Sequence, residues 1–394
     1  MSQALDGLHV LDLSRFIAGP ICAMHLADMG ADVIKVERPG GEDARQNAPF
    51  VNGHSIYAMT FNRNKRAITV NTRSPKGVAL LRRLVQWADV VVENYRPGTM
   101  EAMGLGYEDL RRINPRVILT SVSGMGQTGP QRNRAMFDAA AQAASGLAFR
   151  NGKEGDPPMF TGAFLADYIA GAYAAFGTML ALFHREQTGE GQLVDISLLD
   201  SLFSVLGIPM ASWLVLGEKM PRTGNRDAYT SPAGIFEATD GYLYLHAGTD
   251  ALFRRLVGVM GQPGLADDPT YATVVARMSN VEATEAVVST WLADLTMKDA
   301  GALLDKAGVP YSEVADIEGA ATNEQLLARD MIVEVEHAEA GRVVLPGVVV
   351  KLSGTPGRVR EAPPIVGQHT DEVLTGLLGL SPDEVRALRD EGAV

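Results

Sequence analysis

The sequence predicts an α/β fold in which a Rossmann-like large domain is joined to a smaller α+β domain. Three observations support this prediction. In the N-terminal part, short β-rich runs alternate with helical patterns, which is typical of βαβ units in a parallel sheet. Beyond residue 225, the turn signal Asp240-Gly241 lies between two β-like runs and predicts a hairpin, with helical patterns after it. The chain ends in further β-like runs and a capped helix, which we expect to rejoin the large domain.

The large domain is expected to begin with strands and helices in alternation. The expected strands are HVLDLS, DVIKVER, DVVVENY and RVILTSVS. The helical patterns between them are GPICAMHLADMG, SPKGVALLRRLVQWA and GYEDLRRIN. In the second of these helices, Ser74 suits the N-cap and Pro75 suits the first helical position. Its apolar residues recur at helical spacing, so we expect an amphipathic helix that lies on the sheet.

Two patterns rich in small residues follow, FDAAAQAASGLAF and GAFLADYIAGAYAAFGTMLALFHREQ. The second is apolar nearly all round, so we expect a buried helix. The run VDISLLDSLFSVLGIPMASWLVLG fits strand and helix equally well by periodicity. We expect residues 1–205 to form the large domain, completed by residues 330–394. Residues 206–224 are expected to be a linker, and residues 225–329 the small α+β domain.

Composition narrows the class of protein. The 394 residues are 46% hydrophobic and 21% charged, as in an ordinary soluble enzyme. A net charge of -12 argues against a nucleic-acid partner. The single cysteine, Cys22, excludes an intrachain disulfide and a multi-cysteine metal site. The seven histidines lack metal-binding spacing, so we expect no metal. With no leader and no apolar run long enough for a bilayer, we expect a cytoplasmic protein that has no membrane partner.

One glycine motif resembles a dinucleotide fingerprint. The stretch SVSGMGQTGP places Gly124, Gly126 and Gly129 directly behind an expected strand. However, Pro130 and a polar run follow where a helix would have to begin, and the acidic residue expected about twenty positions on is missing. We therefore interpret the motif as a glycine loop at the C-terminal edge of the sheet, which is where open α/β sheets bind ligands.

Asp167 is the most unusual carboxylate of the sequence. It lies in the most apolar expected helix, where an ionised group is costly unless it is paired or near the helix start. One interpretation is a first-turn acid that satisfies free amides. Phe164 stands three residues before it, so Asp167 does not complete a capping box. The other interpretation is a buried carboxylate nucleophile that attacks a carbonyl group.

Taken together, the motifs resemble the class III CoA-transferases, a family that includes formyl-CoA transferase, carnitine CoA-transferase and the related α-methylacyl-CoA racemase. The resemblance rests on LDLSRFIAGP, LADMGADVIKVERPGGED, NKRAITVN, ADVVVENYRPGTMEAMGLGYEDLRRINPRVILTSVSGMGQTGP, FDAAAQAASGL, TGEGQLVDISLLDS, SPAGIF and PPIVGQHTDEVL. It implies ring-shaped subunits in an interlocked homodimer. It also implies CoA or acyl-CoA as substrate, no permanently bound cofactor, and a small carboxylic acid as acceptor.

The resemblance assigns roles to individual residues. It places the catalytic nucleophile at Asp167 and a second acidic active-site residue at Asp138. Asp167 would form a mixed anhydride with the acyl group and then an aspartyl-CoA thioester, which is covalent catalysis. The resemblance places the contacts to CoA at Ala18, Arg38, Val70, Asn94, Tyr95 and Met103.

Departures from the family pattern bear on the substrate. Ile17 and Ala102 replace a glutamine and an arginine of formyl-CoA transferase, so we expect Arg96 to supply a phosphate contact and formyl transfer is disfavoured. Racemases that resemble this chain have a histidine where Phe137 stands, and phenylalanine moves no proton. A transferase is therefore favoured. The alternative hypothesis is an α-methylacyl-CoA racemase, and a third hypothesis is a CoA-binding protein without catalytic activity.

Three arginines are candidates for binding a second carboxylate on the substrate. They are Arg15, Arg45 and Arg222, and they favour a small dicarboxylic acid as acceptor.

Overall fold

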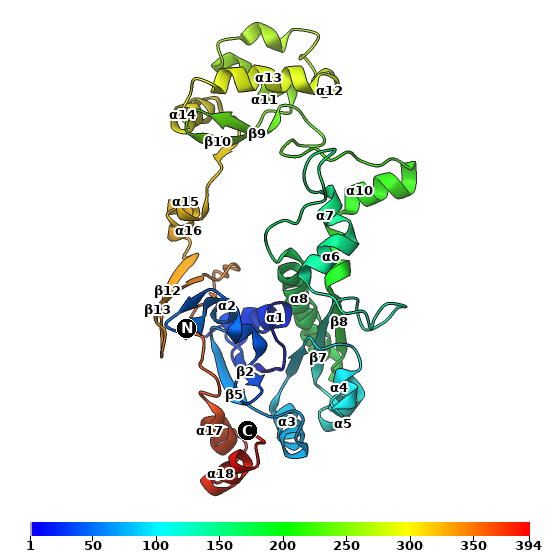
Figure 1. Ribbon diagram of the computed structural model, residues 1–394, viewed down its shortest axis with the longest axis vertical. Helices are drawn as coiled ribbons and strands as arrows, with labels where there is room; N and C mark the ends of the chain where they lie inside the picture. The colour runs from blue at the N-terminus through cyan, green and yellow to red at the C-terminus, as the bar shows by residue number, and fades with distance from the viewer. Residues whose placement is uncertain (1) are drawn as a thin grey trace. The chain divides into compact units, whose positions relative to one another are not determined.

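The computed structural model describes residues 2–394 and divides into two compact units. Unit 1 comprises the chain up to Ala148, Phe160–Gly217 and Glu324–Val394. Unit 2 comprises Phe149–Met159 and Glu218–Asn323. The prediction of a mixed α/β fold with a parallel central sheet is confirmed, since unit 1 is built on such a sheet (Figure 1).

The sheet of unit 1 has six parallel strands in the order β5-β2-β1-β6-β7-β8. The strands are β1 (His9–Asp12), β2 (Asp32–Glu37), β5 (Lys65–Thr69), β6 (Val90–Glu93), β7 (Ile118–Ser123) and β8 (Leu193–Ser197). In chain order they lie 3-2-1-4-5-6 across the sheet, which is the doubly wound order. The direction of winding reverses between β1 and β6. In open α/β sheets the carboxyl ends of the strands at such a switch point form the ligand crevice.

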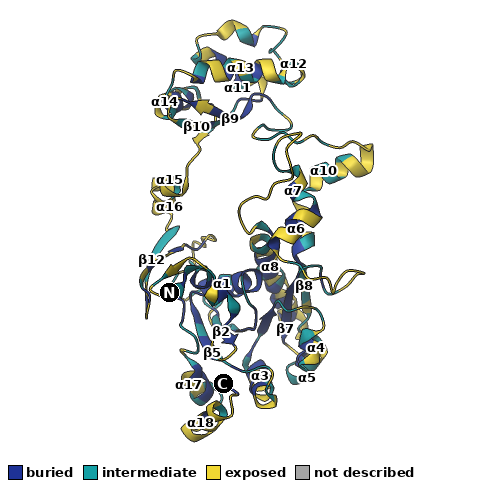
Figure 2. Cartoon of the chain, in the orientation of Figure 1, coloured by how far each residue is buried: buried dark blue, intermediate teal, exposed yellow. Residues whose placement is uncertain are grey.

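Helices cover both faces of this sheet because its strands are apolar on both sides. Helices α1 (Ala18–Asp28) and α8 (Leu165–Thr188) pack on one face, against side chains such as Val10, Val92 and Val122. Helices α3 (Pro75–Trp87), α4 (Thr99–Ala102) and α5 (Tyr107–Ile113) pack on the other. Successive strand residues alternate between the two cores. Figure 2 shows the strands as the most deeply buried part of unit 1.

Helix α8 differs from one sequence-based expectation. By length and composition it is apolar enough to cross a membrane, although no such run was expected. In the structure Ala170 and Ala174 are fully buried in the core shared with α1, and Arg185 pairs with Asp89 at 2.9 Å. Core helices of soluble proteins pass the same test of length and composition. The helix passes the test because its few charged residues lie at its two ends, which leaves an uncharged apolar middle.

The run that fitted strand and helix equally contains both. It forms β8, then α9 (Leu198–Ser204), α10 (Gly207–Ala211) and the π-helical turn η2 (Ser212–Leu216). The other elements of unit 1 before its C-terminal segment are η1 (Asp43–Gln46), β3 (Phe50–Val51), β4 (His54–Ser55), α2 (Ile56–Thr60), α6 (Asp138–Ser145) and α7 (Leu147–Arg150), which runs on into unit 2.

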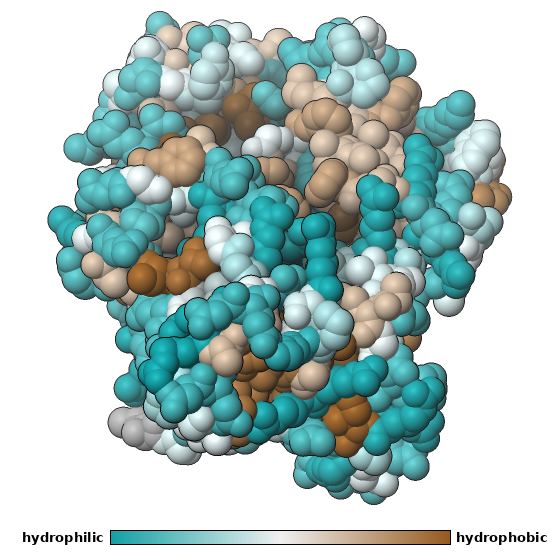
Figure 3. Space-filling view, turned by 60° about the horizontal axis from the view of Figure 1, so that its bottom comes forward, coloured by the Kyte–Doolittle hydropathy of each residue, from teal (hydrophilic) through white to brown (hydrophobic). Residues whose placement is uncertain are grey.

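The C-terminal segment, Glu324–Val394, belongs to unit 1 and returns to its sheet. Its elements are α16 (Glu324–Ala328), β12 (Ile332–His337), β13 (Gly341–Pro346), α17 (Thr370–Glu372), η4 (Val373–Leu377) and α18 (Pro382–Asp390). The His369 amide donates to the Ala67 carbonyl of β5 at 2.8 Å, and the Asn71 amide donates to the Ala393 carbonyl at 2.8 Å. Helices α17 and α18 therefore lie beside α3 at the lower end of unit 1 (Figure 1). Hydrophilic side chains dominate the face in Figure 3, and apolar ones appear as separate patches.

Unit 2 is built on a three-stranded antiparallel sheet in the order β11-β10-β9. Its strands are β9 (Ala233–Ala238), β10 (Gly241–His246) and β11 (Tyr311–Glu313). The Asp240-Gly241 turn joins β9 to β10, so the predicted hairpin is confirmed. Its helices are α11 (Asp250–Val259), η3 (Pro263–Ala266), α12 (Val274–Ser279), α13 (Val281–Leu292), α14 (Met297–Ala307) and α15 (Ile317–Ala321).

Candidate active site

A cavity of about 530 Å³ lies at the carboxyl ends of the strands of unit 1. The turn after β1, the turn after β6, the end of β7, the start of α6 and the start of α8 all contribute to its walls. Asp138 and Asp167 line it together with four arginines, Arg15, Arg96, Arg132 and Arg134. Cations therefore outnumber acids around the cavity, which suits an anionic ligand.

Asp167 lies in the first turn of α8, where it faces the cavity. Burial raises the pKa of its carboxyl group to about 7, and the negative charge of Asp138 acts in the same direction. Because this value is near neutral pH, the carboxylate is both available and more basic than an ordinary aspartate. A buried carboxylate with these properties is a good nucleophile toward a carbonyl carbon.

Asp138 supplies the cap that the sequence of α8 lacks. Phe164 at the N-cap of α8 makes no side-chain cap. Instead, Oδ2 of Asp138 accepts hydrogen bonds from the amides of Ala166 at 2.7 Å and Asp167 at 3.2 Å. Its Oδ1 accepts a hydrogen bond from Nε2 of Gln142 at 2.6 Å. The carboxylate of Asp138 therefore satisfies free helix amides and fixes the backbone from which the Asp167 side chain projects.

A glycine allows α8 to approach α1 at the cavity. Gly171 lies one turn after Asp167, on the same face of the helix. A Cβ at this position would lie 2.8 Å from the carbonyl oxygen of Ala18 and 2.7 Å from Ile21. Any other residue would push the two helices apart. Gly171 therefore sets the distance between the Asp167 turn and the start of α1, where Ala18 lines the cavity.

The turn between β1 and α1 is held from several sides. Both ends of the Asn94 amide bind the backbone of Arg15, with Oδ1 accepting at 2.7 Å and Nδ2 donating at 2.6 Å. Phe16 has a positive φ of 62°, a conformation that costs energy for a non-glycine residue. Its amide donates to Oε2 of Glu42 at 2.9 Å. The Arg15 guanidinium lies 5.5 Å from the centre of the Tyr95 ring.

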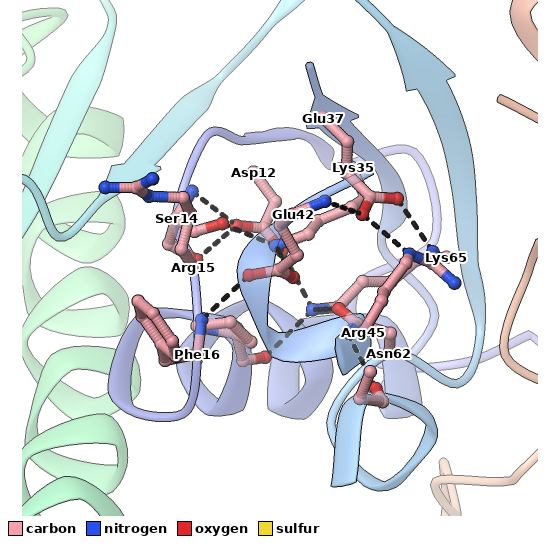
Figure 4. Close-up of polar contacts among 12 residues, drawn as sticks. Asp12, Ser14, Arg15, Phe16, Lys35, Glu37, Glu42, Arg45, Asn62 and Lys65 are labelled. Carbon is pink, nitrogen blue, oxygen red and sulfur yellow. Dashed lines mark hydrogen bonds and ion pairs between the residues drawn. The ribbon is translucent and has the colours of Figure 1, made fainter. Parts of the chain in front are cut away.

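A buried network of charged side chains lies next to this turn (Figure 4). Lys65 donates to Oδ2 of Asp12 at 2.8 Å, and Lys35 pairs with Oε1 of Glu42 at 3.1 Å. Arg45 binds both oxygens of the Glu37 carboxylate at 2.7 Å each. These six residues, from β1, β2, β5 and the segment after β2, are called the buried charge network below.

Comparisons of the sequence with protein families and with known proteins identify the family of this chain. A family model described as CoA-transferase family III matches residues 5–370. The chain belongs to this family. It is 37% identical to succinyl-CoA–D-citramalate CoA-transferase from Chloroflexus aurantiacus, over 98% of this chain and 97% of that protein. It is 36% identical to succinyl-CoA:glutarate CoA-transferase from Mus musculus, over 100% of this chain and 90% of that protein.

Solved structures give the same result. The crystal structure of a CAIB/BAIF family protein from Brucella suis superimposes with a TM-score of 0.86 at 33% sequence identity. The match covers 96% of this chain and 100% of that one. The prediction of a family III CoA-transferase, made from motifs alone, is confirmed.

Of the eight residues that the family resemblance assigned to catalysis or CoA binding, five line the cavity. Ala18, Asn94, Tyr95, Asp138 and Asp167 all line it. The other three residues of the set lie elsewhere in unit 1. Val70 is fully buried, and Met103 packs against the same core. The Arg38 side chain is about half exposed and binds Asp43 and the Gly41 carbonyl.

The three arginines that were candidates for binding a second substrate carboxylate lie in three different environments. Arg45 is bound to Glu37 within the buried charge network. Arg222 belongs to unit 2, where it donates to the carbonyl oxygens of Asn151 and Pro157. Arg15 lines the cavity. Sequence reasoning missed Arg132 and Arg134, whose only signal was the polar character of the run before Asp138.

The glycine loop after β7 is a wall of the cavity, and no helix begins in it. A Cβ on Gly124 would lie 2.4 Å from Cβ of Met136, so this position has no room for a side chain. The amide of Gln127 donates to both oxygens of Asp195 at 3.0 Å. The next helix, α6, starts only at Asp138. The structure therefore agrees with the rejection of a dinucleotide fingerprint.

Proposed function

We propose that this family III enzyme transfers CoA from an acyl-CoA thioester to a small dicarboxylic acid, with succinyl-CoA as a donor. The observation that carries the proposal is Asp167, a carboxylate of raised pKa that faces a cavity with four arginines. The full-length relatives named above supply the substrate class, since each name pairs succinyl-CoA with a dicarboxylic acid.

The mechanism that fits the site uses Asp167 as the covalent nucleophile. Its carboxylate attacks the thioester carbonyl, and the CoA thiolate leaves as a mixed anhydride forms. The thiolate then attacks the aspartyl carbonyl, which gives an aspartyl-CoA thioester and releases the first carboxylic acid. The acceptor carboxylate attacks this thioester to form a second anhydride and to release CoA thiolate again. Attack of that thiolate on the acyl carbonyl gives the new acyl-CoA and regenerates Asp167.

The rest of the site supports these steps. Asp138 holds two amides at the start of α8, so the Asp167 backbone is fixed while its side chain changes bonding partners. The aromatic side chains of Phe16, Tyr57 and Phe164 line the cavity and limit the access of water to the anhydrides. Phe137 also lines the cavity and carries no group that transfers a proton, which gives no support to the racemase alternative.

A homodimer is part of the proposal, as in the family that the sequence resembles. Phe176, Leu180 and Phe183 of α8 are exposed in the single chain. Exposed apolar groups of this size are typical of a surface that another chain covers. Light scattering should give twice the mass of 42.1 kDa, and a mass of one chain would contradict this part of the proposal.

Oxygen-18 labelling tests the mechanism directly. The enzyme would be incubated with succinyl-CoA and glutarate whose carboxyl oxygens are oxygen-18, and the peptide that contains Asp167 would be analysed by mass spectrometry. The second anhydride step transfers one labelled oxygen to the Asp167 carboxyl group. Transfer of CoA without any label in Asp167 would refute the anhydride mechanism.

A pair of variants completes the test. Asp167→Asn is expected to abolish CoA transfer. Asp200→Asn is the matched control, because Asp200 is also an aspartate in the first turn of a helix, α9, but does not line the cavity. Running the reaction in heavy water separates the alternative, since incorporation of deuterium next to the thioester without CoA transfer would identify a racemase.

A further inference from the structure

Arg15 differs from the other arginines of the cavity in how firmly its backbone is held. Arg132 and Arg134 lie in an exposed polar run before α6, and Arg96 is exposed in the turn after β6. Arg15 lies instead in the short turn from β1 to α1, between two central elements of the fold. A charged group that must select among similar substrates works best from a rigid position.

Five successive polar groups of the backbone in this turn are each bonded by a side chain. The Ser14 amide donates to Asp12 at 3.0 Å, and the Ser14 carbonyl accepts from Lys35. The amide and carbonyl of Arg15 bind the two ends of Asn94, and the Phe16 amide binds Glu42. The turn is therefore fixed on both sides of Arg15. This arrangement also holds Phe16 at its positive φ.

Three of the four side chains that hold the turn belong to the buried charge network, and that network is costly to build. Asp12, Lys35 and Lys65 are almost completely buried. Burial lowers the pKa of Lys65 to about 8 despite the nearby Asp12 carboxylate. Buried ion pairs contribute little net stability compared with apolar side chains of the same size, and their best-attested use is to fix one conformation. In this protein the conformation that they fix is that of the Ser14–Phe16 turn (Figure 4).

The Arg15 guanidinium retains binding capacity. Of its five N–H groups, Nη1 contacts Asp43 at 3.5 Å, and the described residues give its side chain no other hydrogen bond. Asp43 is itself bonded to Arg38, so its charge is already compensated. The guanidinium lies over the Tyr95 ring and its side chain is 42% exposed, so it can bind a carboxylate through two N–H groups at once.

We infer that Arg15 binds the second carboxylate of the dicarboxylic substrate, the one that does not react with Asp167. The same contact serves the acyl group of the donor and the free acceptor, because both carry that carboxylate in turn. Asn94 and Glu42 are positioning residues that act through the Arg15 backbone. This inference rests on the proposed function and adds the residue that would select dicarboxylic over monocarboxylic substrates.

The main test compares Arg15→Met with wild type in two reactions. Transfer from succinyl-CoA to glutarate involves two dicarboxylic substrates, whereas transfer from butyryl-CoA to propionate involves none. Arg15→Met is expected to lower kcat/KM for the first reaction at least about 30-fold, as loss of a charge-assisted contact does. The second reaction should change less than about threefold, within the scatter of surface substitutions. The dissociation constant for glutarate, measured by calorimetry, should rise by the same factor as the first reaction falls.

Two further arginine variants sharpen the result. Arg112→Met removes an exposed arginine that pairs with Asp109 on α5, outside the cavity, and should leave both reactions unchanged. If Arg132→Met rather than Arg15→Met causes the loss with glutarate, the assignment to Arg15 is overturned. It is also overturned if Arg15→Met weakens CoA binding as much as it weakens glutarate binding, since Arg15 would then be a phosphate contact.

The positioning residues have a separate test. Glu42→Gln should raise KM for glutarate about tenfold, while kcat with butyryl-CoA and propionate stays within about twofold, because Glu42 acts through the Arg15 turn and does not line the cavity. A purely structural role would lower both reactions equally and would refute the positioning assignment. A wild-type enzyme that transfers CoA to no acid refutes the proposed function. A wild-type enzyme that is active while Arg15→Met keeps its preference for glutarate refutes only the inference about Arg15.

Discussion

Replacing Asp167 with asparagine should make unit 1 more stable at neutral and alkaline pH. The pKa of Asp167 is raised from 3.8 in the unfolded chain to about 7 in the folded one. An acid with a raised pKa binds its proton more tightly in the folded state. Stability is therefore lost as the pH rises from about 3.8 to about 7, and the full loss persists above that range. Asparagine has nearly the same shape but cannot ionise, so it avoids this loss.

The magnitude follows from the size of the shift. A change of about three pKa units corresponds to about 4 kcal/mol at about 1.36 kcal/mol per unit. Asp167 keeps part of its surface exposed to the cavity, so this figure is an upper value. The expected gain for Asp167→Asn is therefore between about 2 and about 4 kcal/mol near pH 8, and near zero around pH 4.

Urea unfolding of wild type and Asp167→Asn at these two pH values measures the difference. Asp200→Asn serves as the control, because the Asp200 side chain is exposed on α9 and its substitution removes no buried carboxylate. A wild-type protein that is as stable as Asp167→Asn near pH 8 would refute the argument that burial destabilises the Asp167 carboxylate. It would also remove the electrostatic reason for assigning the nucleophile to that residue.

Three further predictions concern the pH dependence of transfer, the contact between α1 and α8, and the stability of unit 2. The kcat/KM of CoA transfer should rise with pH through about 7, as Asp167 loses its proton. Asp138→Asn should move this rise to lower pH, because it removes a neighbouring negative charge. A pH–rate profile that Asp138→Asn moves to higher pH would contradict this. Gly171→Ala should cost about 1 to 3 kcal/mol and reduce transfer, because its Cβ would meet the Ala18 carbonyl; thermal unfolding and an activity assay measure both effects. Arg277→Met should destabilise unit 2 by about 3 kcal/mol or more, since Arg277 is fully buried and donates to three backbone carbonyls and a carboxylate. Limited proteolysis should then cut unit 2 sooner, and unchanged resistance to proteolysis would contradict the stabilising role of Arg277.

Much of the fold could be predicted because its elements carry local signals. The strands of the parallel sheet are short runs rich in β-branched and other apolar residues, and the Asp240-Gly241 turn specifies a hairpin. The run after residue 192 could not be assigned, because it is apolar almost throughout and therefore lacks the periodicity that separates strand from helix. Helix α8 was expected to be buried because it is apolar nearly all round, but only the face toward α1 and the sheet is buried, and Phe176, Leu180 and Phe183 are exposed.

For the candidate site, some residues could be predicted from the sequence, whereas their contacts could not. Asp167 stood out because a lone acid in an apolar helix has few structural explanations. Asp138, whose carboxylate caps this helix, lies 29 positions before Asp167. The family resemblance placed both residues in the active site, but no local pattern predicted the hydrogen bonds between them. Asn94 was expected to contact CoA, and the structure shows that both ends of its amide bind Arg15. Polar residues at the ends of strands were the one available signal for the buried charge network.

By itself, the sequence determined the parallel sheet, the hairpin of the second unit and the family, and it singled out Asp167 as the candidate nucleophile. These properties depend on local patterns or on motifs that carry their meaning within a few residues. Only the tertiary structure decided which charges are neighbours. Burial and the nearby Asp138 set the pKa of Asp167. Side chains from β1 and β2, from the turn after β6 and from the segment after β2 fix the backbone around Arg15. Electrostatic interactions depend on distance and on exclusion of water, and both arise only when distant parts of the chain pack together.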